Sequence, residues 1–215
     1  MLPTITTFQW VPPFARGQVR DIRVRWALEE TGIAYQVALI ADAKTPDHRR
    51  SQPFGQVPTY RDDTVALFES GAIVLHVARQ APGLLPDDPV ARARVEQWVI
   101  AALNSVEPCV MELARADVFE ADQLWTAARR PTVVAAVRTR LQDLAATLGD
   151  SAFLEGDFSA ADLIMACVLR IVPREEILDD YPTLAAYLDR CTERPAFCKA
   201  LADQLALYGP TEVAA

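Results

Sequence analysis

The most informative feature of this chain is a pair of short stretches, Gln56-Val57-Pro58-Thr59-Tyr60 and Phe68-Glu69-Ser70-Gly71-Ala72-Ile73. A proline that opens a short strand leaves the backbone groups of the preceding residue unpaired at the sheet edge, where an extended ligand can pair with them. Glu69 and Ser70 lie where a helix is predicted to begin, and the free N–H groups and positive dipole end of a helix favour a carboxylate. Together the two stretches predict a socket for a small acidic peptide.

The first part of the chain, residues 4 to 81, alternates between strand-like and helix-like patterns. β-branched and alternating residues predict strands at 5–8 and 35–39, and apolar residues at helical spacing predict a helix between them that ends at Thr31-Gly32. A hairpin is predicted at 59–61 and 65–68, followed by a helix at 70–80 with Ser70 as its N-cap. With a weakly indicated helix near 47–52, the predicted order is β-α-β-(α)-β-β-α.

The second part contains almost nothing that resembles a strand. One long apolar face runs from Ala91 to Val106, and Pro108 is expected to kink or interrupt that helix. Pro131 is expected to begin another helix that ends at Leu148, and Pro182 and Pro195 mark the starts of two later ones. We therefore expect a first domain at 1–81, a linker at 82–88, an all-helical domain at 89–208 and a flexible tail at 209–215.

The composition is that of an ordinary globular protein of 215 residues, with 51% hydrophobic and 23% charged residues. A formal charge of -8 argues against non-specific nucleic-acid binding, although four arginines between positions 16 and 25 make that segment locally basic. No apolar run approaches the ~20 residues needed to cross a bilayer, and the first residues lack a secretory-signal pattern. We therefore expect a cytoplasmic protein with no membrane or nucleic-acid partner.

The cysteines and histidines do not predict a metal site. The four cysteines fit neither a CxxC pair nor a zinc framework, and they are interpreted as small buried side chains: Cys109, Cys167, Cys191 and Cys198. His48 and His76 have no carboxylate or second histidine at helical spacing. Metal chemistry is not expected.

The order of elements, together with the two opening stretches, resembles the cytosolic glutathione transferase family over nearly the whole chain. The resemblance implies a thioredoxin-like N-terminal domain, an all-helical C-terminal domain and a cis peptide bond at Val57-Pro58. It also implies that Val57 and Pro58 hold the cysteinyl part of glutathione, that Glu69 and Ser70 hold its γ-glutamyl end, and that Gln56 assists. Ser159 and Asp162 form a predicted capping box that matches a helix start of the family.

The activating group is where the sequence departs from the family. A free thiol has a pKa near 8.5, so a transferase must stabilise the glutathione thiolate. Family members use a Tyr, Ser or Cys soon after the first strand, and the corresponding residues 9–18 contain none of these. Arg16 could favour the thiolate by its charge, and Gln18, or a backbone N–H at the start of the first helix, could donate a hydrogen bond. A solvated Arg16 with no such role is the alternative.

The second substrate and the partner subunit are predicted less directly. Trp10 and Phe14, on a loop stiffened by paired prolines, suit an apolar second substrate, or they are ordinary packing residues. Three residues at i, i+4 and i+8 match the region where the family forms its electrophile pocket: Met111, Arg115 and Phe119. Phe54 is either a core residue or an aromatic key inserted into the second subunit of a homodimer.

The resemblance implies an enzyme that conjugates the thiol of its co-substrate glutathione to a small hydrophobic electrophile, a detoxifying transferase. Two alternatives stay open. One is glutathione-dependent reduction or isomerisation at the same site, which the missing hydroxyl does not exclude. The other is a non-catalytic protein that keeps the fold as a binding or assembly module.

Overall fold

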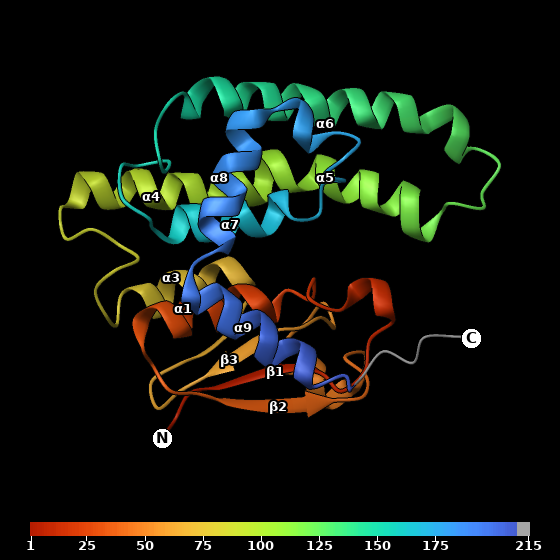
Figure 1. Ribbon diagram of the computed structural model, residues 1–215. Coiled ribbons are helices and arrows are strands. Elements are labelled where there is room, and N and C mark those ends of the chain that lie inside the picture. The colour runs from red at the N-terminus through yellow and green to blue at the C-terminus, as the bar shows by residue number, and fades with distance from the viewer. Residues whose placement is uncertain (210–215) are drawn as a thin grey trace. The chain divides into compact units, whose positions relative to one another are not determined.

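The computed structural model describes residues 1–209, and the chain forms two compact units (Figure 1). The first unit contains Met1–Leu84 and the chain from Arg194 onward, and the second contains Leu85–Glu193. Most of the predicted tail, 210–215, lies outside the described residues. None of the described helices is long and apolar enough to span a membrane.

The first unit is built on a four-stranded mixed sheet in the order β2-β1-β3-β4. Strand β1 (Thr4–Phe8) pairs in parallel with β2 (Gln36–Ile40) and antiparallel with β3 (Thr59–Arg61), which pairs antiparallel with β4 (Ala66–Phe68). The helices are α1 (Asp21–Thr31), α2 (Pro46–Arg49) and α3 (Ser70–Ala78). This confirms the thioredoxin-like order β-α-β-α-β-β-α, including the weakly indicated second helix.

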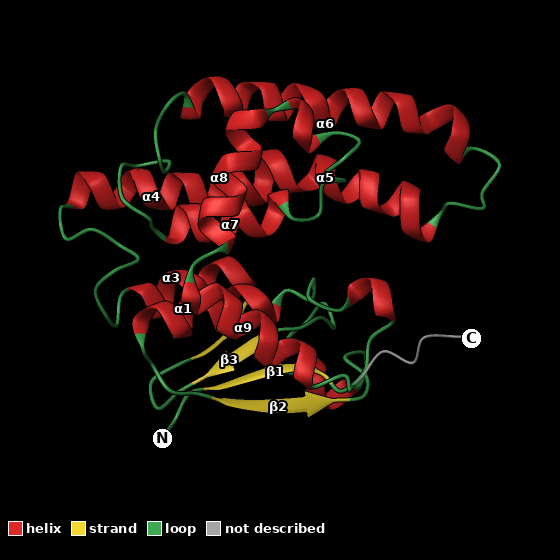
Figure 2. Cartoon of the chain, viewed as in Figure 1, coloured by secondary structure: helices red, strands yellow, loops and turns green. Residues whose placement is uncertain are grey.

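Helices α1 and α3 contact each other and cover one face of the sheet (Figure 2). Helix α1 ends as predicted, because Gly32 adopts φ +68°, a conformation that costs glycine little. The buried face of α1 is completed by Trp26, whose ring lies 4.7 Å from that of Phe197 on α9 (Pro195–Ala206).

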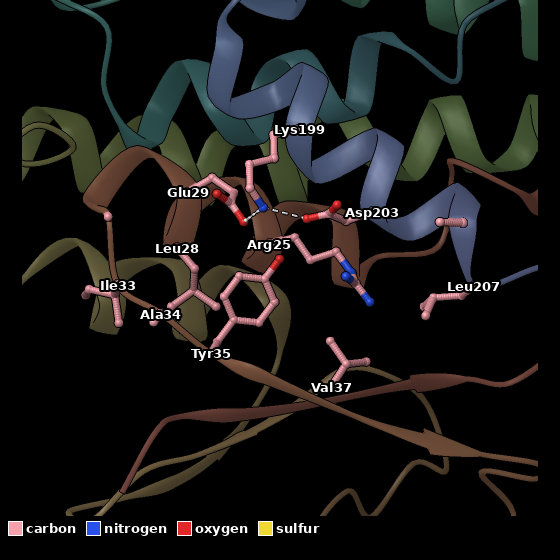
Figure 3. Close-up of a pocket in the computed structure, with 12 residues that line it drawn as sticks. Arg25, Leu28, Glu29, Ile33, Ala34, Tyr35, Val37, Lys199, Asp203 and Leu207 are labelled. Carbon is pink, nitrogen blue, oxygen red and sulfur yellow. Dashed lines mark hydrogen bonds and ion pairs between the residues drawn. The ribbon is translucent and has the colours of Figure 1, made fainter.

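Helix α9 belongs to the first unit, although the sequence analysis assigned it to the helical domain. It packs on α1, and two ion pairs link the two helices. Arg194 binds Glu30 through two nitrogens at 2.6 and 2.7 Å, and Lys199 binds Glu29 at 2.9 Å (Figure 3). Tertiary packing, which helical periodicity does not encode, decides where this helix lies.

The second unit is all helical. Its elements are α4 (Pro89–Ala101), η2 (Ala102–Val106), α5 (Glu107–Ala114), η3 (Arg115–Phe119), α6 (Thr126–Leu148), α7 (Ala160–Leu169), η4 (Leu178–Asp180) and α8 (Pro182–Thr192). Every residue of α7 is buried, and α4, α5 and α8 pack against it. This unit confirms the predicted helical domain.

Two prolines in this unit behave differently. As expected, the chain departs from α-helical geometry before Pro108: a π-helical turn, η2, separates α4 from α5. Pro131 does not begin a helix, so that expectation was wrong. Helix α6 starts at Thr126, and Pro131 lies inside it, so the helix lacks the backbone hydrogen bond that residue 131 would donate.

The capping box of α7 is confirmed. The Asp162 carboxylate accepts the backbone N–H of Ser159 at 2.9 Å, and the Ser159 hydroxyl accepts the N–H of Ala161 at 3.3 Å. Asp162 also accepts the N–H of Leu154 and the hydroxyl of Tyr187, at 2.9 and 3.0 Å. The box therefore fixes both the start of α7 and its contact with α8.

Candidate functional site

The topology of the first unit brings the two stretches singled out in the sequence to one end of the sheet. Because β1 and β3 are antiparallel, the end of β1 lies beside the start of β3, where the N–H of Thr59 donates to Thr6 Oγ1 at 2.8 Å. Thr59 is also opposite Phe68, so β4 ends there as well. The loop after β1, Val57-Pro58 and Glu69-Ser70 therefore converge.

The peptide bond between Val57 and Pro58 is cis, as predicted. Both side chains are buried, and neither the N–H nor the C=O of Val57 has a hydrogen-bond partner within residues 1–209. The preceding carbonyl, that of Gln56, lies 2.7 Å from His48 Nε2, and the Gln56 side chain is exposed. This segment presents the unpaired backbone groups that an extended peptide requires.

The start of α3 differs from the prediction in its N-cap residue. Ser70 is the first residue of α3 and not its N-cap, which is Glu69. Glu69 has φ +69° and is the one described non-glycine residue with positive φ, a conformation that costs roughly 1–3 kcal/mol and tends to occur at functional sites. Its exposed carboxylate makes no cap hydrogen bond, so it stays available for a ligand cation.

Arg23 is a residue that the sequence analysis did not include in the site. Its guanidinium is buried, and Nη1 donates to Ser70 Oγ at 3.2 Å. Ser70 Oγ thus accepts from a cation and retains its own hydrogen for a ligand, beside the first N–H groups of α3. The sequence contained one indication that Arg23 is buried and has a partner, because this arginine lies on the predicted apolar face of its helix, between Val19 and Trp26.

The loop after β1 carries the candidate activating residues. Pro13–Ala15 form a short 3-10 turn, Arg16 follows it, and both Arg16 and Gln18 are partly buried. The N–H of Gln18 already donates to Ala15 O at 3.0 Å, whereas that of Val19 has no partner within the described chain. Trp10 and Phe14 are 65% and 55% exposed, so they are not ordinary packing residues of the folded chain.

Buried hydrogen bonds from Arg25 and from Gln204 on α9 hold the start of α1 in place. The Asp21 carboxylate accepts Arg25 Nε at 2.6 Å and Gln204 Nε2 at 2.7 Å, and Gln204 Nε2 also donates to Val19 O at 3.1 Å. Burial raises the pKa of Asp21, while Arg25 opposes that rise. Helix α9 thereby determines the position of the chain directly after Gln18, a contact between distant residues that no local pattern predicts.

The hairpin that carries the site is held by another carboxylate. Asp62 accepts from Tyr60 Oη at 2.9 Å, from the N–H groups of Thr64 and Val65 at 2.7 and 2.9 Å, and contacts His76 Nε2 at 3.0 Å. Burial opposes ionisation, but these hydrogen bonds outweigh it and hold the pKa of Asp62 well below its ordinary value. Asp62 is therefore ionised at neutral pH and accepts these hydrogen bonds as a carboxylate.

Three of the remaining predicted residues belong to the second unit, and Phe54 belongs to the first. Met111 is on α5 and partly buried, while Arg115 and Phe119 are on η3 and exposed. Phe54 is 61% exposed and lies edge-on to Phe68 at 6.1 Å, which excludes the core interpretation. All four cysteines are free, but Cys198 is exposed and Cys109 partly so, so the expectation of four buried side chains was wrong.

Family models match both parts of this chain. The model described as the N-terminal domain of glutathione S-transferase matches residues 14–79, and that of the C-terminal domain matches residues 116–195. The chain is 32% identical to glutathione S-transferase 1 of Zea mays over 193 residues, which cover 84% of this chain and 90% of the relative. This chain belongs to the cytosolic glutathione S-transferase family.

Solved structures of glutathione transferases share the fold. A glutathione transferase from Burkholderia graminis, with two glutathione molecules bound per subunit, has a TM-score of 0.82 at 24% identity, over 93% of this chain and 87% of its own. Ure2p in complex with glutathione has a TM-score of 0.78 at 20% identity, over 93% of this chain and 92% of its own.

Within the described residues, no group of three or more His, Cys, Asp or Glu is placed to hold a metal ion.

Proposed function

We propose that this glutathione S-transferase family member binds glutathione at the converging end of the sheet and activates its thiol for attack on a small hydrophobic electrophile. The observation that supports this most is the convergence of an unpaired Val57 backbone, an uncapped Glu69 carboxylate and the start of α3. A γ-glutamyl-cysteinyl peptide offers a matching amide, ammonium and carboxylate in that order. Gln56, with its exposed side chain, is the fifth proposed contact beside Val57, Pro58, Glu69 and Ser70.

Each part of glutathione then has a chemical reason for its place. The cysteinyl amide pairs with the Val57 backbone as an added strand would. The γ-glutamyl ammonium binds the Glu69 carboxylate, and the γ-glutamyl carboxylate accepts from the Ser70 hydroxyl and the first N–H groups of α3. The buried Arg23 adds positive charge behind Ser70.

Thiolate formation is assigned to the loop after β1. The Arg16 guanidinium is a permanent cation, and Gln18 and the unpartnered N–H of Val19 are donors at the start of α1. The exposed Trp10 and Phe14 are proposed to contact the electrophile. We further propose a cytoplasmic homodimer in which the exposed Phe54 is the interface key.

One observation favours a second candidate. Residues 9–18 contain no Ser, Thr, Tyr or Cys, so the loop lacks the hydroxyl or thiol that conjugating relatives use. Glutathione-dependent reduction or isomerisation, or binding without catalysis as in an assembly module, would make a smaller demand on thiol activation. The Ure2p likeness is compatible with these alternatives at the level of the fold.

Thiolate absorbance at 240 nm against pH, with glutathione bound, tests the activation step. We expect the bound thiol to titrate below its free value near 8.5 and Arg16→Ala to raise that midpoint by about one unit. Gln18→Leu and Arg61→Ala, the latter an exposed β3 arginine, are the comparison variants. An unchanged midpoint in Arg16→Ala removes Arg16 from the mechanism. A wild-type midpoint equal to that of free glutathione favours the non-conjugating alternatives. An assay of turnover with 1-chloro-2,4-dinitrobenzene then distinguishes them from a transferase, because only a transferase conjugates this electrophile.

A further inference from the structure

The segment between α2 and β3 carries the Val57 backbone, and close contacts determine its shape. Gly55 has φ +63°, and a Cβ atom at this position would lie 2.9 Å from Ala43 O, so the segment packs tightly on the residues that precede α2. One residue earlier, the N–H of Phe54 donates to the buried side chain of Gln52, at 2.7 Å from Oε1. These contacts fix the chain up to the residue before Val57.

His48, on α2, contacts the residue that precedes Val57. Its Nε2 lies 2.7 Å from the carbonyl oxygen of Gln56. A carbonyl oxygen can only accept a hydrogen bond, so Nε2 carries the hydrogen and donates it, in the neutral ring and in the protonated one. The backbone of His48 is itself held, because its carbonyl accepts the N–H of Gln52 at 3.0 Å and its N–H donates to Thr45 Oγ1 at 3.3 Å. The imidazole therefore has a defined place beside the loop.

The carbonyl that His48 holds and the N–H of Val57 belong to one peptide group. The bond between Gln56 and Val57 is trans, and a trans peptide group is planar, with its C=O and N–H pointing in opposite directions. A hydrogen bond on the oxygen therefore also sets the direction of the N–H. It polarises the peptide group as well, which makes the N–H a stronger donor. The N–H of Val57 is one of the unpaired groups to which the cysteinyl part of glutathione is assigned above.

We propose that His48 is a positioning residue for glutathione binding: its imidazole holds the Gln56 carbonyl and thereby directs the Val57 N–H toward the cysteinyl carbonyl of glutathione. His48 acts through the Gln56–Val57 peptide group and makes no contact with the ligand. The inference rests on the proposed function, because it adds a supporting residue to the same site. It also gives a role to a histidine that the sequence analysis considered only as a metal ligand.

Titration calorimetry of S-methylglutathione with the full chain tests this proposal. The ligand keeps the whole peptide of glutathione but has no ionisable thiol, so thiol activation does not enter the comparison. His48→Leu removes the donor, and we expect it to weaken binding about fivefold, the effect of one lost neutral hydrogen bond. Ser51→Leu introduces the same side chain at an exposed position of the same segment, and we expect its affinity to equal that of the wild type.

A matched pair of variants distinguishes positioning from a general disturbance of the loop. The amide nitrogen of glutamine is as many bonds from the backbone as Nε2 of histidine, so His48→Gln can donate to the same carbonyl and should bind within about twofold of the wild type. Asparagine carries the same amide one bond closer to the backbone and cannot reach. His48→Asn should therefore bind as weakly as His48→Leu. Urea unfolding of each variant verifies that the fold is kept.

Glu69→Ala, titrated with the same ligand, separates this inference from the proposed function. Binding that Glu69→Ala weakens but His48→Leu leaves within twofold of the wild type overturns the inference and leaves the proposed function standing. Equal losses in His48→Gln and His48→Asn also overturn it, because the reach of the donor then has no effect. No binding by the wild type, or binding that both Glu69→Ala and His48→Leu leave unchanged, overturns the proposed function and this inference together.

Discussion

Gln204→Leu is expected to loosen the start of α1 and to destabilise the first unit by about 2–3 kcal/mol. Leucine has a similar size but donates no hydrogen bond. The substitution removes the 2.7 Å bond to the buried Asp21 carboxylate and the 3.1 Å bond to Val19 O. The charge-assisted bond to Asp21 accounts for about 1.5–3 kcal/mol. The neutral bond to Val19 O accounts for the lower end of the roughly 0.5–1.5 kcal/mol expected of such a bond, because Val19 O keeps its bond from the N–H of Ile22.

Urea unfolding at pH 7, followed by circular dichroism, measures this loss, and Gln97→Leu, an exposed glutamine on α4, is the matched control. We expect the control to stay within about 0.5 kcal/mol of the wild type. Gln204→Glu is a second comparison, because a carboxylate placed beside Asp21 destabilises more at pH 7 than at pH 5. A loss below about 0.5 kcal/mol for Gln204→Leu would refute the claim that α9 holds the start of α1.

Three further predictions concern a hairpin turn and two helix caps. Asp162→Ala removes four hydrogen bonds, one of them the carboxylate acceptor of the buried Tyr187 hydroxyl, so thermal unfolding should show a loss of about 3–5 kcal/mol; a loss under 1 kcal/mol contradicts the role of the capping box. Because the pKa of Asp62 is lowered in the folded state, its carboxylate stabilises the fold at pH values above its unfolded-state pKa. The difference in stability between wild type and Asp62→Asn should therefore be constant above about pH 5 and shrink below about pH 4. A difference that does not change with pH would exclude this contribution of Asp62. Glu69→Gly relieves the positive φ and should raise stability by about 1 kcal/mol while weakening glutathione binding, and calorimetric scanning with and without glutathione separates the two effects.

Local patterns predicted the elements whose signals are contained in a few neighbouring residues. The apolar spacing of α1, the prolines at the starts of α8 and α9 and the capping box of α7 all describe structure within one or two turns. Val57-Pro58 and Glu69-Ser70 could be placed in one site because the hairpin between them is short. The resemblance to a family, and not the dipeptide itself, supplied the cis bond.

The features that the sequence did not predict depend on contacts between residues far apart in the chain. Nothing near Pro195 indicates that α9 packs on α1, since the same amphipathic helix suits either unit. Ser70 was predicted as an N-cap from its residue type, but the chain reaches α3 through Glu69 in a conformation that residue types do not specify. Arg23 and Gln204 needed the fold before their partners, Ser70 and Asp21, could be recognised. A charged residue on an apolar face was the one usable sign.

The most direct test of the proposed function is a calorimetric titration of glutathione into the wild-type chain, Glu69→Ala and Glu175→Ala, an exposed glutamate of the second unit. We predict saturable binding of one glutathione per chain, weakened in Glu69→Ala by about 1.5–3 kcal/mol, or roughly 10- to 150-fold, and unchanged in Glu175→Ala. No binding by the wild type at millimolar glutathione, or equal affinity in Glu69→Ala and the wild type, would contradict it.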